Sequence, residues 1–450
     1  MKPHYLNNPK SPLYYSIHGK GYSAAKGHIP DFFFERIIHP IGQGGFFTES
    51  FNIDNVPFSA VYDCGSFSYS AKFNKGKISP LEKFIKKSLS KTGIKNEIDL
   101  LMVSHFDADH FNGIKFLPDY KLVLIPLLSQ KQKIVLSILS TIGIIKTNLS
   151  LINDPKSFFK NVKIVQVLPD YFEPGDTYYD LDGSILENLP ESYVSPVLNI
   201  GDKDNSIQNF PRMIKSNIPI QISIGDSKLT FWEYIPFNHN VANLSTKFLN
   251  EIKSQTALDY DQIIKYPTGE YVKNHLEEIK NLFKDKTKLG DPNDYSMIVY
   301  SGPSLDTCCN LIELKGEDPL WESFFPILKY GDHNDNSGDL ACLYTGDIKF
   351  DSNWLPDYIE SIESARMDLI SGIQIPHHGS KNNNGHLIVE EFNKKSSNSI
   401  VYFISADPSI RYHHPDKETI ENIIPNLKND SALHLVSTLE TSSLSVTIHI

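Results

Sequence analysis

Cysteine is scarce in this sequence, and its arrangement excludes a disulfide-built protein. The 450 residues include four cysteines, Cys64, Cys308, Cys309 and Cys342, and no CxxC pair. That pattern is unlike the framework of a small secreted domain. The adjacent Cys308 and Cys309 are poorly placed for a disulfide with each other, so we interpret them as buried thiols.

Long apolar runs are missing as well. No run approaches the roughly eighteen residues that a membrane span needs. The polar start, Met1–Tyr5, lacks the hydrophobic core of a signal peptide. These absences predict a cytoplasmic protein with no membrane partner. The hydrophobic fraction of 40% is ordinary for a globular protein, and the length allows two or three domains.

The chain also has no strongly basic block. Its formal net charge is −11, and its lysines gather only in short groups such as Lys83, Lys86 and Lys87. Such groups are typical of the solvated face of a helix. Proteins that hold nucleic acid through its phosphates generally have a basic surface. The charge therefore argues against tight nonspecific binding of DNA. It does not exclude a local basic groove.

One motif concentrates ligand-type side chains. His105, Asp107, Asp109 and His110 directly follow the apolar run Ile98–Val103, which we expect to be a buried strand. The motif would then lie at the carboxyl end of a strand, where α/β sheets place their ligands. Imidazole and carboxylate suit zinc and manganese, and so tight a group could reach two neighbouring ions. The competing interpretation is a solvated turn, since aspartate is common in turns.

Three further clusters place Asp or His near a glycine at the end of a predicted apolar strand. They are Asp63–Gly65, Thr345–Asp347 and His377–Ser380. Each alone is weak evidence, because such sequences are usually turns or ordinary surface. Together they predict a sheet that gathers carboxylate and imidazole at one edge, as a two-metal hydrolytic site requires. The glycines of Gly42–Gly45 indicate a tight turn or a close approach of the backbone.

The order of predicted elements favours an α/β sandwich. Through residue 168 it runs strand, strand, strand, helix, strand, motif, strand, helix, strand. We predict an irregular extension over residues 1–30 and a hydrolase domain over residues 31–450.

The motifs, in their order along the chain, resemble those of the metallo-β-lactamase fold. Within that fold they resemble the branch that holds the soluble hydrolase domain of the competence DNA-uptake protein ComEC. The resemblance spans about residues 35–450, with insertions at about 115–290 and 303–338. The residues that carry it are Gly42-Gln43-Gly44, Asp63-Cys64-Gly65, His105-Phe106-Asp107-Ala108-Asp109-His110, Asn293-Asp294-Tyr295-Ser296, Thr345-Gly346-Asp347 and His377-His378-Gly379-Ser380.

The resemblance implies an αββα sandwich whose two half-sheets lie face to face, with two divalent ions, zinc or manganese, at their shared edge. His105 and Asp107 would hold one ion, and Asp109 and His110 the other. Asp347 would bridge the two ions. One of the paired histidines would complete the set; we favour His377 as that ligand, with His378 supporting it or facing the substrate.

The same resemblance suggests the other roles. Asp109 would also orient the attacking hydroxide, and His414, or its neighbour His413, would touch substrate or donate a proton. Further residues are assigned to substrate binding and to support of the site. The substrate-binding residues are Asn293, Ser296 and Ser380, and the supporting residues are Asp63 and Gly65.

Three departures from the family pattern have chemical consequences. Asp107 stands where the commoner motif has histidine, and its oxygen ligand makes manganese more suitable beside zinc. Asn293 and Ser296 stand where most relatives place a further histidine, so the first metal position lacks a ligand. Gly45 replaces the usual aspartate.

We therefore expect a metal-dependent hydrolase, a phosphodiesterase or nuclease acting on nucleic acid or a nucleotide. Paired ions clamp the attacking and leaving oxygens of such a displacement. The insertions suggest a lid or a protein partner, as in an effector of a bacterial defence system. Two alternatives remain: an ester, thioester or amide hydrolase of the same fold, and a non-catalytic, metal-stabilised protein that binds a partner.

Overall fold

The structure is a computed structural model. It describes residues 32–449 except 54, 70–77, 95, 173–174, 187–193, 201–204, 225–229, 240–243, 256, 284–294, 306–339, 397, 412 and 429–430. The predicted extension over residues 1–30 therefore lies outside the described residues, as do Asn293, Cys308 and Cys309. The predicted insertion at 303–338 is described only at its start.

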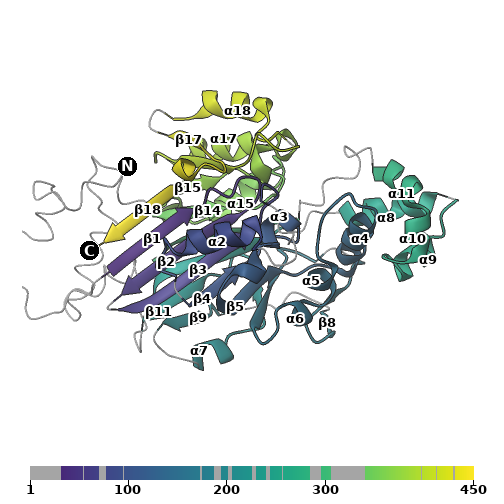
Figure 1. Ribbon diagram of the computed structural model, residues 1–450, viewed down its shortest axis with the longest axis horizontal. Coiled ribbons are helices and arrows are strands. Elements are labelled where there is room, and N and C mark those ends of the chain that lie inside the picture. The colour runs from purple at the N-terminus through teal and green to yellow at the C-terminus, as the bar shows by residue number, and fades with distance from the viewer. Residues whose placement is uncertain are drawn as a thin grey trace, which may run out of the picture.

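Two eight-stranded mixed sheets form the centre of the molecule (Figure 1). In spatial order, the first sheet consists of β10 (Met213–Lys215), β6 (Lys163–Leu168), β5 (Asp119–Pro126), β4 (Glu97–Met102), β3 (Val56–Cys64), β2 (Phe46–Ile53), β1 (Phe32–Ile38) and β18 (Leu444–His449). Strands β3 to β6 and β10 run parallel, whereas β3, β2, β1 and β18 pair antiparallel.

The second sheet repeats this plan with a later part of the chain. In spatial order it consists of β17 (Ala432–Val436), β16 (Val401–Ser405), β15 (Ile370–Gln374), β14 (Ala341–Tyr344), β13 (Met297–Pro303), β12 (Thr230–Asn238), β11 (Ile220–Ile224) and β9 (Val197–Ile200). Strands β14 to β17 are parallel, and β11 to β14 are antiparallel. A separate two-stranded sheet pairs β7 (Tyr178–Tyr179) with β8 (Ile185–Leu186).

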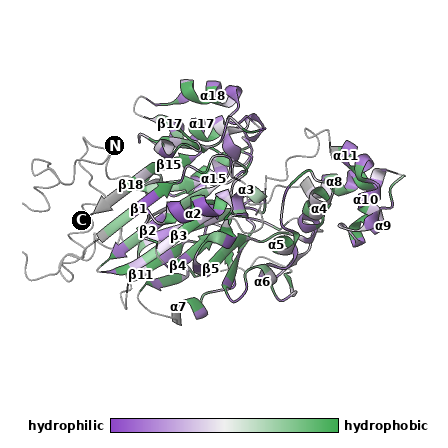
Figure 2. Ribbon diagram, viewed as in Figure 1, coloured by the Kyte–Doolittle hydropathy of each residue, from purple (hydrophilic) through white to green (hydrophobic). Residues whose placement is uncertain are grey.

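Aromatic side chains from both sheets fill the space between them. Phe47 and Phe51 of β2 lie against Tyr344 and Trp232 of the second sheet, with ring centroids 5.4 and 4.9 Å apart. Burial of such large apolar surfaces is the main stabilising term in a fold. Hydrophobic residues are accordingly concentrated in the strands (Figure 2).

Helices cover both outer faces, which gives four layers in the order α, β, β, α. On the first sheet they are α2 (Pro80–Leu89), α4 (Gln130–Thr141) and α5 (Leu149–Asn153), and on the second α15 (Leu355–Ser361), α17 (Gly385–Lys395) and α18 (Lys417–Ile423). The mixed α/β class expected from the sequence is thus confirmed. Assignment to the metallo-β-lactamase fold stays a prediction.

Capping residues explain where the helices on the first sheet begin. The Ser79 hydroxyl accepts a hydrogen bond from the Glu82 amide, and Pro80 occupies the first helical position of α2. Ser129 and Gln132 form a reciprocal capping box at the start of α4.

The predicted insertion at 115–290 includes much of both sheets as well as a helical lobe. It contributes β5, β6 and β9 to β12, and the lobe lies beyond α4 (Figure 1). The lobe consists of α8 (Leu244–Ser254), α9 (Tyr260–Lys265), α10 (Glu270–Asn274) and α11 (Leu276–Phe283). The remaining helices are short: α3 (Ala108–Phe111), α6 (Pro155–Phe158), α7 (Asn205–Gln208), α16 (Ser364–Met367), and the 3₁₀ turns η1 (Ile114–Phe116), η3 (His377–Gly379), η4 (Lys381–Asn383), η5 (Ile424–Asn426) and η6 (Glu440–Ser442).

A buried ion pair lies in the layer between the sheets. The Nε of Arg36 on β1 donates to Oε1 of Glu49 on β2 at 2.6 Å, and both side chains are almost fully buried. Tyr344 also donates to Oε1, whereas Tyr234 and Ser301 donate to Oε2, at 2.7–2.8 Å. Because these three donors belong to the second sheet, the Glu49 carboxylate joins the two sheets.

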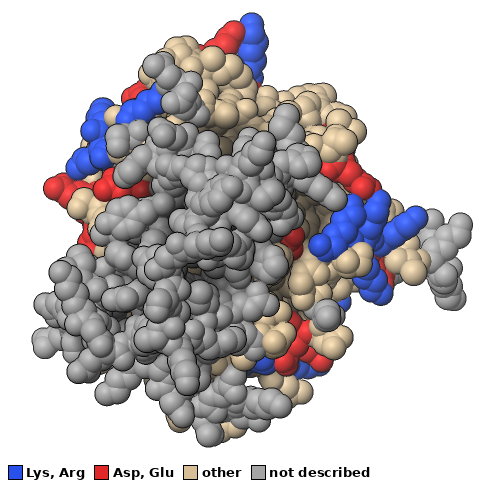
Figure 3. Space-filling view, turned by 90° about the vertical axis from the view of Figure 1, so that its left-hand side faces the viewer, with Lys and Arg blue, Asp and Glu red and all other residues tan. Residues whose placement is uncertain are grey.

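One face of the molecule shows charged side chains of both signs among its described residues (Figure 3). On this face, basic and acidic side chains lie beside one another. Lys87 and Lys91, for example, both pair with Glu440. No helix in the described part of the chain combines the length and the apolar character needed to cross a membrane.

Candidate metal centre

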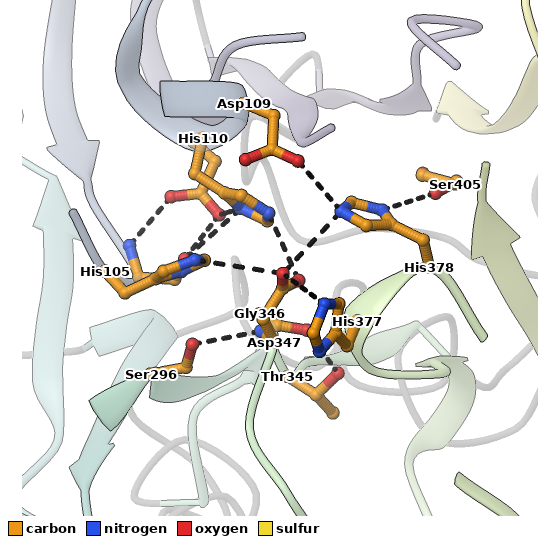
Figure 4. A network of polar contacts seen from close by, with 12 residues as sticks. His105, Asp109, His110, Ser296, Thr345, Gly346, Asp347, His377, His378 and Ser405 are labelled. Atoms are coloured by element: carbon orange, nitrogen blue, oxygen red, sulfur yellow. Dashed lines mark hydrogen bonds and ion pairs between the residues drawn. The ribbon is translucent and has the colours of Figure 1, made fainter. Parts of the chain in front are cut away.

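Ligand-type side chains from both sheets meet at the edge where parallel strands end (Figure 4). The first sheet supplies His105, just after β4, and Asp109 and His110 on the short helix α3. The second supplies Asp347, just after β14, and the histidines of η3, just after β15. The sequence prediction that these clusters meet at one edge agrees with this arrangement.

Asp347 lies at the centre of the cluster. Its Oδ1 is 3.1 Å from Nε2 of His110. Its Oδ2 is 3.6 Å from Nε2 of His378, 3.8 Å from Nε2 of His105 and 3.9 Å from Nε2 of His377. Four imidazoles therefore direct the same ring nitrogen toward one carboxylate.

Two groups within the cluster are compact enough to hold a metal ion. The first consists of His105, His110 and Asp347, and the second of Asp109, His110 and His378. Nε2 of His378 lies 3.2 Å from Oδ2 of Asp109. Of the two paired histidines, it is therefore His378, and not the favoured His377, that belongs to a compact group.

The predicted ligand Asp107 belongs to neither group. It occupies the position before the first residue of α3 and forms a backbone bridge with Thr147. Its side chain makes no capping hydrogen bond to that helix.

Asp63, which we predict to support the centre, lies at the end of β3 and contacts two of its residues. Its carboxylate accepts hydrogen bonds from the amide and the hydroxyl of Ser104, both at 2.7 Å. Its Oδ2 lies 2.8 Å from Nδ1 of His110. A carboxylate behind a histidine fixes the ring and keeps the proton on Nδ1, which leaves Nε2 available to a metal.

Hydrogen bonds at Nδ1 orient two other histidine rings in the same way. The Ser104 hydroxyl donates to Asp63, so it accepts from Nδ1 of His105, 2.9 Å away. Nδ1 of His378 lies 2.7 Å from the carbonyl oxygen of Ser405, which can only accept. The neutral His105 ring therefore presents an unprotonated Nε2 to the centre, whereas Nε2 of His378 donates to Oδ2 of Asp109 at 3.2 Å, a proton that a bound metal ion would displace.

Glycines allow the backbone to pack against the motif. A Cβ on Gly65 would lie 2.6 Å from the carbonyl carbon of Asp109, and one on Gly44 2.6 Å from its oxygen. Gly45 donates its amide to that same oxygen at 3.1 Å. The close approach suggested by these glycines is therefore toward Asp109, and a larger residue would displace it.

The loop that carries Asp347 is held by polar side chains. The Ser296 hydroxyl accepts from the Asp347 amide at 3.0 Å, and Oε1 of Gln374 accepts from the Thr345 amide, also at 3.0 Å. Nδ2 of Asn383 donates to the carbonyl oxygen of Asp347 at 2.8 Å. The sequence prediction missed Gln374 and Asn383. The signal for Gln374 was a single polar residue inside an apolar run.

Ser296, Ser380 and His414, which we predict to bind or contact the substrate, have different surroundings in the structure. Ser296 is fully buried against the Asp347 loop, so it positions that loop. Ser380 is buried and caps η4. His414 borders the centre, with its ring centroid 6.0 Å from that of His377, and burial lowers its pKa to about 4.

The buried carboxylates and imidazoles of the centre shift one another's pKa. Burial raises the pKa of Asp347, but His110, His378 and His377 offset this and hold it well below its usual value. Burial lowers the pKa of His110, but Asp347 and Asp63 raise it well above its usual value. The centre thus favours a positive charge at His110. In the described part of the chain, the ion pairs of Asp63, Asp109 and Asp347 are all with histidines.

These residues fit a divalent metal ion. Among the described residues, Nε2 of His105 is buried without a hydrogen-bond partner, and Nε2 of His110 and Oδ1 of Asp347 are buried with only each other, 3.1 Å apart. Buried polar atoms are normally paired, and a metal ion would satisfy all three. Imidazole nitrogen together with carboxylate oxygen is a donor set for zinc or manganese.

No protein-family model matches the chain, and no curated protein is significantly similar to it. The functional argument therefore rests on the chemistry of this centre.

Proposed function

We propose that the chain is a metal-dependent hydrolase of the metallo-β-lactamase fold that cleaves phosphodiester bonds in nucleic acid or nucleotides. One observation carries the proposal: the ring nitrogens of four histidines converge on the buried Asp347 carboxylate, and Nε2 of His105 has no hydrogen-bond partner among the described residues. A structural role alone would not require such a nitrogen to remain unpaired.

Each residue has a defined part in this proposal. His105, His110, His378 and Asp347 would hold divalent ions, and Asp63 and Ser104 would fix the histidine tautomers. Asp109, which is buried beside His378, would bind the second ion and orient the attacking water. Bound zinc or manganese would polarise the phosphoryl oxygen and make that water more acidic.

The phosphodiester is favoured over other bonds by the resemblance of the motifs and by the chemistry of paired ions. The acidic net charge and the mixed charge of the face in Figure 3 favour a small or single-stranded substrate over a long duplex. We place the enzyme in the cytoplasm. The lobe formed by α8 to α11, which lies beyond α4 (Figure 1), would bind a protein partner, as an effector of a bacterial defence system would need.

A substrate panel tests the proposal. Single- and double-stranded DNA, RNA, cyclic nucleotides and a generic phosphodiester are incubated with the protein and zinc or manganese. We expect cleavage that a chelator abolishes and that Asp109→Asn lowers at least a hundredfold. Asp99→Asn is the matched control, because Asp99 is on β4, which leads into the motif, and pairs with Lys121 away from the centre.

Absence of cleavage by folded, metal-loaded wild type would refute the phosphodiesterase. Cleavage of ester, thioester or amide substrates by the same preparation would then identify the alternative hydrolase. Equal cleavage by wild type and Asp109→Asn would show that the activity does not belong to this centre.

A further inference from the structure

The two compact groups share one histidine, so two metal ions cannot each be held by all three residues of its group. His110 belongs to each group, but its Nδ1 faces Asp63 and only its Nε2 faces the centre. A single ring nitrogen binds one ion. If His110 serves the ion held by Asp109 and His378, then the other position retains only His105 and Asp347.

His377 is oriented to fill that position. Nδ2 of Asn383 donates to the carbonyl oxygens of Asp347 and Ile348, so its Oδ1 is the acceptor of the amide. That Oδ1 lies 2.8 Å from Nδ1 of His377, which must therefore carry the proton. Nε2 of His377 is thus the nitrogen of the neutral ring that can bind a metal ion, and it lies 3.9 Å from Oδ2 of Asp347.

The backbone of the paired histidines supports a role for both. His377 and His378 have φ angles of 48° and 56°, in the left-handed region that residues with a Cβ seldom adopt. Strain of this kind persists where the surrounding structure imposes it, and it occurs preferentially at functional sites. The result is that two consecutive side chains direct Nε2 at one carboxylate, with their ring planes 82° apart.

We infer that the two histidines bind different ions. His378 serves the second position with Asp109 and His110, whereas His377 serves the first with His105, and Asp347 is shared. His377 would thereby supply the ligand that, by the resemblance to the metallo-β-lactamase fold, is missing from the middle of the chain. The inference rests on the proposed function for the presence of metal ions, but it makes no use of the substrate.

The test measures metal content independently of activity. Metal-free full-length protein is equilibrated with zinc at a nanomolar free concentration set by a chelator buffer, and bound zinc is counted by mass spectrometry. We expect two ions in wild type and one in each of His105→Ala, His377→Ala and His378→Ala. His275→Ala, in the helical lobe, is the control and should retain two.

Double variants identify the partners. His105→Ala with His377→Ala should still bind one ion, because both residues serve the same position. His377→Ala with His378→Ala should bind none. Circular dichroism checks folding. If His377→Ala is unfolded, His377→Asn gives the same comparison.

Retention of two ions by a folded His377 variant would overturn the inference, as would a wild type that binds a single ion. Failure of the proposed function has a different signature, namely a two-ion wild type that cleaves nothing in the substrate panel.

Discussion

Replacement of Glu49 by glutamine should destabilise the protein severely, although the two side chains have nearly the same shape. The Glu49 carboxylate accepts four hydrogen bonds between the sheets, one of them from Arg36. A glutamine offers one acceptor oxygen and would direct an NH₂ group at two of those donors. It would also leave the Arg36 guanidinium buried without its counter-charge. Arginine cannot relieve this by losing its proton.

The magnitude follows from the burial of the pair. Removal of one partner of a buried ion pair costs about 3–5 kcal/mol, and no discount for solvent screening applies, since Arg36 is only 4% exposed and Glu49 3%. With a urea m-value of about 3 kcal/mol/M, the midpoint of unfolding should fall by about 1–1.7 M. Urea titration followed by circular dichroism measures this shift.

A double-mutant cycle separates the lost charge from lost shape. Arg36→Met with Glu49→Gln removes the unpaired cation, so the double variant should be about 1–2 kcal/mol more stable than Glu49→Gln alone. Glu35→Gln is the control, because Glu35 is the neighbour of Arg36 on β1 and is only half-buried; its effect should stay within about 0.5 kcal/mol. A cost below about 1 kcal/mol for Glu49→Gln, or a double variant less stable than that single one, would refute the reasoning.

Two further predictions concern protonation and support of the centre. Burial, and to a lesser extent the charge of Lys91, lowers the pKa of His39 to about 3. Below the ordinary histidine pKa of about 6.5, His39 therefore gains a proton only in the unfolded state. The free energy of unfolding should fall as the pH drops. The contribution of His39 to the loss between pH 6.5 and 4.5 should be about 2–3 kcal/mol; in urea unfolding at both pH values, His39→Gln should lose less stability than wild type by this amount, and equal pH dependence in the two would disprove it. Asp63→Asn should weaken zinc binding by about 10–100-fold in a chelator competition, because Nδ1 of His110 loses its carboxylate; an affinity equal to that of Asp99→Asn would show that this support is unimportant.

The sequence predicted the parts of the centre that follow from local pattern. An apolar strand followed at once by His105 and Asp109 required only periodicity and residue chemistry, and the structure places both residues at a sheet edge. The support by Asp63 was also predictable, since it ends a strand beside a glycine. These residues lie next to the elements that position them.

The parts that depend on direction in space could not be predicted. The favoured ligand was His377, but the structure places His378 in a compact group, because the left-handed backbone of η3 sets the direction of each ring. Asp107 has the right chemistry and spacing, yet it stands before the first turn of α3 and belongs to neither group. Nor does the spacing of Ser296 in the sequence show that its hydroxyl bonds the Asp347 amide.

The division of the centre between the two sheets has a consequence during synthesis. A nascent chain that has emerged only as far as residue 340 contains His105, Asp109 and His110, but it lacks Asp347 and both histidines of η3. Nor does it contain Ser405, whose carbonyl fixes His378. The centre is therefore incomplete in a nascent chain until Ser405 has been translated, and the proposed reaction would have to wait until then.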